Sequence, residues 1–190
     1  MKPESEYSNL KTRIVTIFGS SRAQPGDAEY QTAYDLGKRL AQAGYAICNG
    51  GYGGIMEASA HGTKDAGGKT IGIVTEQFSV EANPYILQKI VMKTLIDRLL
   101  KLIELGDAYV VLKGSTGTLL ELAAVWEHMN KRLLKQKPII VLGDFWSPVV
   151  QTLKDELSHE GLVNATHYVQ LVRTPEECLN VLKKSFQMLT

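Results

Sequence analysis

A glycine-rich turn and a carboxylate that follows it could do chemistry together in this chain. Residues 114–118, with the sequence Gly-Ser-Thr-Gly-Thr, come after a short apolar run and before a stretch with helical periodicity. The first N–H groups of a helix have no partner inside the helix, and the helix dipole favours an anion there. The amides and three hydroxyl groups of this turn could therefore hold a phosphate. The candidate phosphate-binding residues are Gly114, Ser115, Thr116, Gly117 and Thr118.

Glu121 and Arg98 are the charged side chains that could act beside this turn. Glu121 lies three residues after Thr118, which predicts a position within the first turn of the helix, near the sugar of a bound nucleotide. Arg98 is its natural opposite charge. Both also have ordinary structural interpretations, since a first-turn Glu complements the helix dipole and a lone Arg usually lies at the surface. The glycines, likewise, could merely form a tight turn.

Two better-known phosphate motifs are missing from the sequence. A Walker A motif requires Gly-Lys-Ser/Thr at its end, whereas Leu119 and Leu120 follow the turn here. The dinucleotide fingerprint G-x-G-x-x-G is not found after Gly19, and the turn that contains Gly51 has Met56 in place of the third glycine. The sequence therefore disfavours nucleoside triphosphate hydrolysis and favours a mononucleotide over a dinucleotide.

Composition and charge exclude several classes of protein. The 190 residues fit one domain, and a formal net charge of +1 lacks the basic excess of a nucleic-acid-binding domain. Two cysteines are too few for a disulfide scaffold, and the four histidines show no metal-ligand spacing. The chain has no run of about 18 apolar residues, and its start lacks the apolar core of a signal peptide. We therefore expect a cytoplasmic protein with no membrane or nucleic-acid partner, no metal and no cofactor.

Short apolar runs alternate with amphipathic stretches along the rest of the chain. Strands are predicted at 13–18, 45–49, 69–74, 108–112, 138–142 and 167–171. Helices are predicted at 28–43, 55–66, 92–105, 119–134, 148–160 and 175–186, the last with Thr174 as its N-cap. Residues 75–91 have no clear period and are predicted to be a long connection of the kind that forms lids or binding loops.

This alternation predicts an α/β fold. We expect a single doubly wound Rossmann-like domain over residues 13–190, after a polar N-terminal segment at 1–12. Its mostly parallel sheet would have about six strands, with helices on both faces. Ligands of such folds bind at the carboxyl ends of the strands. Three small-residue turns are expected there, at 19–21, 49–54 and 114–118.

The same turns carry a resemblance to a known family. Residues 49–56 (NGGYGGIM), Arg98 nine residues before Asp107, and residues 114–121 (GSTGTLLE) resemble the LONELY GUY (LOG) family. The hallmark of that family is P-G-G-x-G-T-x-x-E together with an upstream Arg. The resemblance extends from about residue 13 to residue 182, and the order and spacing of the blocks make it specific.

The resemblance implies both an activity and the roles of particular residues. LOG proteins are cytokinin riboside 5′-monophosphate phosphoribohydrolases, which cleave the N-glycosidic bond of a purine nucleotide to give the base and ribose 5-phosphate. The family therefore implies AMP or a cytokinin-like nucleotide as substrate, Glu121 and Arg98 as catalytic residues, and a homodimer. The nucleotide pocket that it implies comprises Ser20, Ser21, Gly50, Gly51 and Met56.

Several positions depart from the family pattern and leave an alternative open. Lys113 stands where the family has Pro, Ser115 replaces the second Gly of the hallmark, and Glu57 follows Met56 where many members have Gly. Leu99 replaces a Lys that often follows the Arg. Molybdenum cofactor carrier proteins share the fold and a related glycine motif. The alternative function is therefore a non-catalytic nucleotide-binding or molybdenum-cofactor-binding protein.

Overall fold

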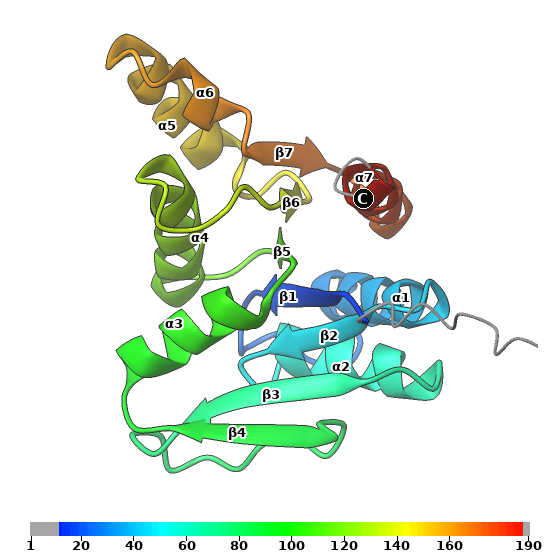
Figure 1. Ribbon diagram of the computed structural model, residues 1–190. Coiled ribbons are helices and arrows are strands. Elements are labelled where there is room, and N and C mark those ends of the chain that lie inside the picture. Colours follow the sequence, from blue (N-terminus) through cyan, green and yellow to red (C-terminus); the bar gives the residue numbers. More distant parts are fainter. Residues whose placement is uncertain (1–11, 188–190) are drawn as a thin grey trace, which may run out of the picture.

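Seven parallel strands form one sheet in the computed structural model, which describes residues 12–187 (Figure 1). The order across the sheet is β4-β3-β2-β1-β5-β6-β7. The strands are β1 (Ile14–Phe18), β2 (Ala46–Asn49), β3 (Thr70–Thr75), β4 (Gln88–Met92), β5 (Ala108–Val111), β6 (Ile139–Leu142) and β7 (Val169–Val172). The helices are α1 (Ala28–Gln42), α2 (Ile55–Asp65), α3 (Leu95–Leu105), α4 (Thr116–Asn130), α5 (Ser147–His159), α6 (Val163–Thr166) and α7 (Pro175–Gln187).

The central strands are apolar along their whole length because both faces of the sheet are covered. Every residue of β2, β5 and β6 is buried, as expected for parallel strands between two layers of helices. Helices α1, α2 and α7 cover one face, and α3, α4 and α5 cover the other (Figure 1). The fold is therefore the doubly wound α/β architecture predicted from the alternation of strands and helices.

Two glycines let α1 and α2 pack unusually closely on their face of the sheet. A Cβ atom at Gly37 would lie 2.1 Å from the carbonyl oxygen of Ser59, and one at Gly62 would lie 2.0 Å from that of Tyr34. Any side chain at these two positions would push the helices apart. This contact fixes α2, whose first turn contributes to the site described below.

One strand was missed by the sequence prediction. Strand β4 lies inside and just beyond the segment 75–91 that was predicted as an irregular connection, so the sheet has seven strands rather than about six. As an edge strand it is partly exposed, and its residues Gln88 and Lys89 face solvent. Its pattern therefore lacks the continuous apolar run that marks the buried strands. The short helix α6 was missed as well.

The start of α4 also differs from the prediction, with a consequence for Glu121. The helix begins at Thr116 rather than at residue 119, so part of the glycine-rich turn is itself helical. Glu121 consequently lies in the second turn of α4, and the first turn contains no acidic residue. The prediction that Glu121 complements the dipole from the first turn was wrong, which removes the simplest structural explanation for this carboxylate.

Other predictions concern the ends of the chain and the cysteines. The predicted N-terminal segment 1–12 lies, apart from its last residue, outside the described residues. Cys48 and Cys178 are both buried and free. The hydroxyl of Thr174 accepts a hydrogen bond from the backbone N–H of Glu177, as predicted for the N-cap of the last helix. Within residues 12–187, no helix is long and apolar enough to cross a membrane.

Candidate active site

The amino-terminal end of α4 opens onto a cavity of about 530 Å³ at the carboxyl ends of the strands. Ser115 precedes the helix in extended backbone, and its hydroxyl makes no capping hydrogen bond. A Cβ atom at Gly117 would meet nothing within 4 Å, so the backbone of the first turn faces open space. At Gly114, in contrast, a Cβ atom would lie 2.1 Å from the hydroxyl oxygen of Thr118. The first glycine is therefore required by packing, and the second leaves room for a ligand.

The cavity brings together most of the residues that the sequence singled out. Hydroxyl groups at the helix end and at the turn after β1 line it together with apolar side chains. The predicted residues that line it are Ser20, Ser21, Met56, Arg98, Ser115, Gly117, Thr118 and Glu121. Gly50, Gly51 and Thr116 do not line it, and Gly114 lines a neighbouring cavity instead. Sequence reasoning missed Arg22, Tyr52, Phe78, Val80 and Leu95, which also line the cavity.

Arg98 is held in the interior by contacts on several sides. Its Nε donates a hydrogen bond to the carbonyl oxygen of Ile73, within β3, at 2.7 Å. The guanidinium lies over the ring of Tyr52, 5.5 Å from its centroid, and Nη2 lies 3.9 Å from the sulfur of Met56. Burial lowers the pKa of Arg98, and the nearby Glu121 opposes that shift. The guanidinium is thus a fixed positive charge in the cavity, not a surface group.

Glu121 faces this guanidinium from α4. The closest approach between Arg98 Nη1 and Glu121 Oε1 is 3.9 Å, and the Glu121 side chain is only 15% exposed. Burial raises the pKa of Glu121 to about 7, with Arg98 acting in the opposite direction. Both protonation states are therefore populated near neutral pH. A carboxylate with such a pKa can stabilise a developing positive charge or exchange a proton with water.

Asn49 organises the glycine-rich turn after β2. Its buried amide donates to the carbonyl oxygen of Met56 at 2.8 Å, and its side-chain oxygen accepts the backbone N–H of Gly51 at 2.8 Å. Gly51 and Gly54 have φ angles of +77° and +67°, a backbone region that favours glycine. Ser20 connects this turn to the others, because its N–H donates to the carbonyl of Lys113 and its carbonyl accepts from Ile55. Hydrogen bonds therefore link all three turns.

The connection between β3 and β4 contributes apolar side chains to the lining of the cavity. Asn83 anchors it, since its amide donates to the carbonyl oxygens of Gly51 and Tyr52 at 3.1 and 2.8 Å. The same connection brings the ring of Phe78 to 5.7 Å from the ring of Tyr52, measured between the ring centroids. Phe78 is 43% and Val80 63% exposed, which is high for apolar side chains that line a cavity. The segment predicted as a lid or binding loop does border the cavity.

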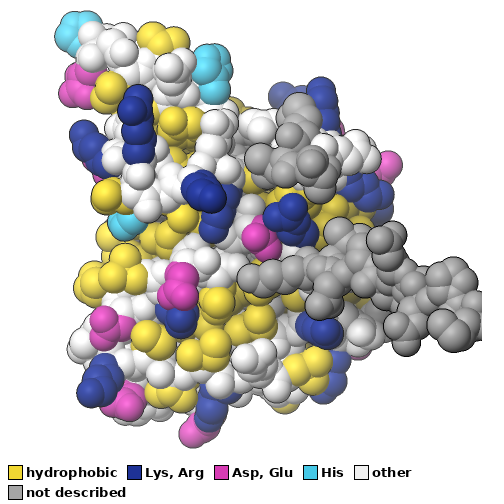
Figure 2. Space-filling model, viewed as in Figure 1, with side chains coloured by type: hydrophobic (Ala, Val, Ile, Leu, Met, Phe, Trp, Pro, Cys, Tyr) yellow, Lys and Arg dark blue, Asp and Glu magenta, His cyan; other side chains and the backbone are white. Residues whose placement is uncertain are grey.

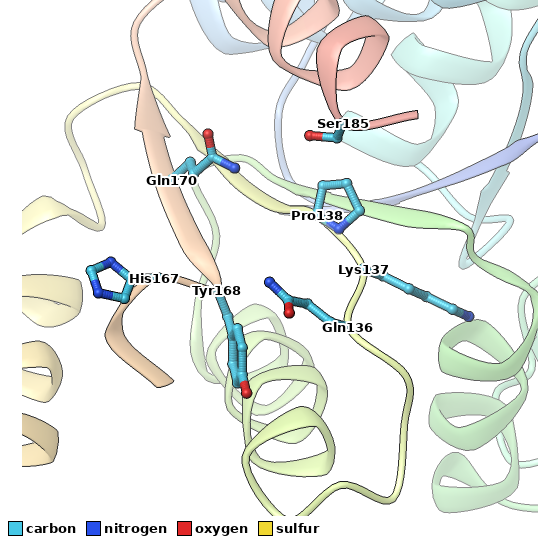
Figure 3. Close-up of a pocket in the computed structure, with 7 residues that line it drawn as sticks. All are labelled: Gln136, Lys137, Pro138, His167, Tyr168, Gln170 and Ser185. Atoms are coloured by element: carbon cyan, nitrogen blue, oxygen red, sulfur yellow. The ribbon is translucent and has the colours of Figure 1, made fainter. Parts of the chain in front are cut away.

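A separate cavity of about 240 Å³ lies near the amino ends of β6 and β7, away from the glycine-rich turns (Figure 3). No carboxylate lines it. Figure 3 shows that the Lys137 and His167 side chains extend in opposite directions and do not converge on a common point. Within residues 12–187, no group of three or more His, Cys, Asp or Glu side chains could hold a metal ion.

The fold and this cavity together define a doubly wound α/β protein with a buried Arg–Glu pair at its strand ends. Within that class, the chain belongs to the SLOG cluster4 family, whose model matches residues 12–178. The match and the relatives below confirm the resemblance to LOG proteins that was drawn from residues 49–56, Arg98 and residues 114–121.

Three proteins are similar to this chain in sequence, and two of them are named as phosphoribohydrolases. It is 32% identical over 133 residues to an uncharacterised protein of Archaeoglobus fulgidus, which covers 70% of this chain and 85% of that one. It is 29% identical over 159 residues to the cytokinin riboside 5′-monophosphate phosphoribohydrolase of Rhodococcoides fascians. That match covers 80% of this chain and 78% of the relative. The cytokinin riboside 5′-monophosphate phosphoribohydrolase LOG of Oryza sativa is 28% identical over 160 residues, which make up 80% of this chain and 63% of the relative.

Solved structures with a similar fold carry a different name. The molybdenum cofactor binding protein of Rippkaea orientalis superposes with a TM-score of 0.72 at 27% identity, over 95% of this chain and 99% of that one. The molybdenum cofactor carrier protein of Chlamydomonas reinhardtii also gives a TM-score of 0.72, at 19% identity, over 93% and 99%. At 19% identity, the similarity to the Chlamydomonas reinhardtii protein shows a shared fold only.

Gly50 tests how tightly Arg98 is held. A Cβ atom there would lie 1.7 Å from Arg98 Nη2, so Gly50→Ala must displace the buried guanidinium and strain its hydrogen bond to Ile73. We expect a loss of about 2 kcal/mol or more in the free energy of unfolding, measured by urea denaturation. Gly117→Ala is the matched control, because its Cβ enters open space in a helix and should not destabilise the protein. Equal stability of Gly50→Ala and the wild type would contradict this account of Arg98.

Proposed function

We propose that this protein hydrolyses the N-glycosidic bond of a purine nucleoside 5′-monophosphate such as AMP, releasing the base and ribose 5-phosphate. The observation that carries the proposal is the buried Glu121 carboxylate, 3.9 Å from Arg98, in a cavity that also contains the start of α4. A cavity of about 530 Å³ is large enough for a mononucleotide.

The nucleotide would lie in the cavity between its hydroxyl groups and its apolar side chains. The 5′-phosphate would bind the free N–H groups at the start of α4 and the hydroxyl groups of Ser115 and Thr118. The ribose would then lie beside Glu121, and the base would contact the apolar side chains of Met56 and Phe78. Binding energy from the distant phosphate would align the sugar with the carboxylate.

The chemistry would depend on charge that develops during bond cleavage. Breaking the bond between C1′ and the base nitrogen leaves positive charge on the ribose, as in glycoside hydrolysis. Ionised Glu121 would stabilise that charge and orient a water molecule, whose oxygen bonds to C1′ while its proton passes to the carboxylate. The departing base takes up a proton from solvent at its nitrogen, and Glu121 afterwards releases the proton of the water molecule to solvent, so no net proton is consumed. Arg98 would favour the ionised form of Glu121 in a buried setting.

Relatives support the hydrolase class, and a structural neighbour supports an alternative. The proteins of Rhodococcoides fascians and Oryza sativa are named as phosphoribohydrolases. The Rippkaea orientalis protein is named for binding the molybdenum cofactor and is 27% identical to this chain. A phosphorylated small-molecule ligand is common to both functions. The alternative is a carrier that binds this ligand without hydrolysing it. Analysis of the products formed from AMP distinguishes the two functions.

Hydrolysis of AMP is the direct test. Purified protein should convert AMP to adenine and ribose 5-phosphate, resolved by chromatography. The Glu121→Gln variant, which keeps the shape of the side chain but removes its charge, should lower kcat by at least about a hundredfold and still bind AMP. Near-normal activity of that variant would contradict the catalytic role of Glu121. Tight binding of AMP that leaves it intact in the wild-type protein would favour the carrier function.

The pH dependence follows from the raised pKa of Glu121. Because the reaction would need the ionised carboxylate and burial raises its pKa to about 7, activity should fall as the solution becomes more acidic. We expect kcat/KM for AMP to decrease about tenfold between pH 8 and pH 6, with a midpoint near pH 7. A rate that stays constant down to pH 5 would show that an unperturbed carboxylate, or none, is responsible.

The outer surface near the cavity supports the further proposal of a homodimer. On α3, Ile96 and Leu100 are 55% and 45% exposed and lie one helical turn apart, and on α4 Leu120 is 43% exposed. Figure 2 shows hydrophobic side chains gathered where α3 approaches the start of α4. Contiguous apolar surface of this kind is typical of a protein–protein interface.

A charge on this surface should separate the subunits. Leu100→Glu is expected to convert a dimer to a monomer in sedimentation velocity experiments, because it would bury an unpaired carboxylate in the interface. Leu133→Glu is the matched control, since Leu133 is 74% exposed and follows the far end of α4. A wild-type protein that sediments as a monomer, or a Leu100→Glu variant that remains dimeric, would contradict the proposed interface.

A further inference from the structure

Tyr52, in the glycine-rich turn after β2, is a buried aromatic residue of the cavity lining and is held at two points. Its hydroxyl oxygen accepts the backbone N–H of Thr75 at 2.9 Å. Its backbone carbonyl oxygen accepts the side-chain amide of Asn83 at 2.8 Å. Both hydrogen bonds are buried, so the tyrosine ring has little freedom to move and forms a fixed surface inside the cavity.

The guanidinium of Arg98 lies over this ring. Its central carbon is 5.5 Å from the ring centroid, within the range in which an aromatic face attracts a cation. The hydrogen bond to Ile73 holds only Nε, and Nη2 has a long contact of 3.9 Å with the Met56 sulfur. The Tyr52 ring therefore limits how far the outer nitrogens can move, including Nη1, which faces Glu121.

The position of the guanidinium matters because Arg98 is the charge that acts on Glu121. It lowers the pKa of this carboxyl against the larger, opposing effect of burial. Arg22 lines the same cavity from the turn after β1, but it is exposed, and solvent screens its charge. Tyr52 and the buried Cys48 of β2 also lie close to the guanidinium. A displacement of Arg98 would therefore leave Glu121 more protonated.

We propose that Tyr52 is a positioning residue, whose ring holds the Arg98 guanidinium against Glu121. The inference rests on the proposed function for the reaction that this placement serves, whereas the effect of Tyr52 on Glu121 needs no substrate. The role belongs to the ring and not to the hydroxyl group, because the hydroxyl is bonded to Thr75 and the ring contacts the guanidinium. Arginine suits such a contact because its flat guanidinium stacks on aromatic faces.

Direct titration of Glu121 tests this role without substrate. The full-length protein is labelled with ¹³C at the glutamate side-chain carboxyl, and the Glu121 signal is the one that Glu121→Gln removes. In Tyr52→Leu the midpoint of its titration should rise by about one pH unit, because the opposite charge is no longer held beside it. In Tyr52→Phe, which keeps the ring, the midpoint should stay at the wild-type value.

Hydrolysis of AMP gives a second readout, one that general structural damage would not reproduce. At pH 7, kcat/KM of Tyr52→Leu should be about fivefold below that of the wild type, and it should recover at pH 9, where Glu121 is ionised in both proteins. Phe78→Leu is the matched control, since it removes the neighbouring ring of the cavity lining and leaves Tyr52 in place. It should raise KM for AMP without moving the midpoint of the pH profile.

Two outcomes would overturn the role of Tyr52. The titration of Glu121 could be unchanged in folded Tyr52→Leu protein, or Tyr52→Phe could raise it as much as Tyr52→Leu does. If Tyr52→Leu does not fold, Tyr52→Met replaces it with the same expected rise. Failure of the proposed function is seen separately, as intact AMP after incubation with wild-type protein. A protein that leaves AMP intact but shows the expected titrations would retain the role of Tyr52 in placing Arg98 and lose the hydrolase.

Discussion

The need to stabilise a buried guanidinium shapes the region around the cavity. A charge removed from water is costly unless hydrogen bonds and opposite charges compensate for it. Arg98 receives that compensation from the Ile73 carbonyl, the Tyr52 ring and Glu121, and it fits only because residue 50 has no side chain. Each contact comes from a different segment, so the guanidinium fixes the relative positions of β3, α3, α4 and the turn after β2.

The strand order explains why these segments meet. The chain runs outward from β1 through β2 and β3 to β4, and then returns to place β5 on the other side of β1. The connections after β1 and β5 therefore leave in opposite directions and open a crevice between them, as is general for doubly wound sheets. The residues after β1 form one wall of the cavity and of the neighbouring one that Gly114 lines, and the start of α4 after β5 forms another. Topology thus supplies the crevice, and the local residues give it charge.

The sequence predicts the parts of this arrangement that have strong local signals. Buried strands such as β2 and β5 are continuous apolar runs in the sequence, and clusters of small residues mark the turns at their ends. β4 gave no such signal because an edge strand is partly exposed. Arg98 had the spacing of a family motif, but its burial depends on Ile73 and Tyr52, which are distant in sequence. Phe78 and Val80 were missed as lining residues because their segment has no periodicity, and its position depends on the hydrogen bonds of Asn83 to the turn after β2.

The Arg98–Glu121 pair also has a cost that argues for a role beyond stability. Because burial raises the pKa of Glu121 to about 7, the folded protein holds this proton more tightly than the unfolded chain, where the ordinary value is 4.5. The contribution of Glu121 to stability is therefore greatest at acidic pH and declines as the pH rises from about 4.5 to about 7. At 3.9 Å the two groups are also too far apart for a direct hydrogen bond. A pair kept for stability would be closer and fully bonded. The separation instead leaves unused hydrogen-bonding capacity on both groups, which a bound sugar and a water molecule could satisfy.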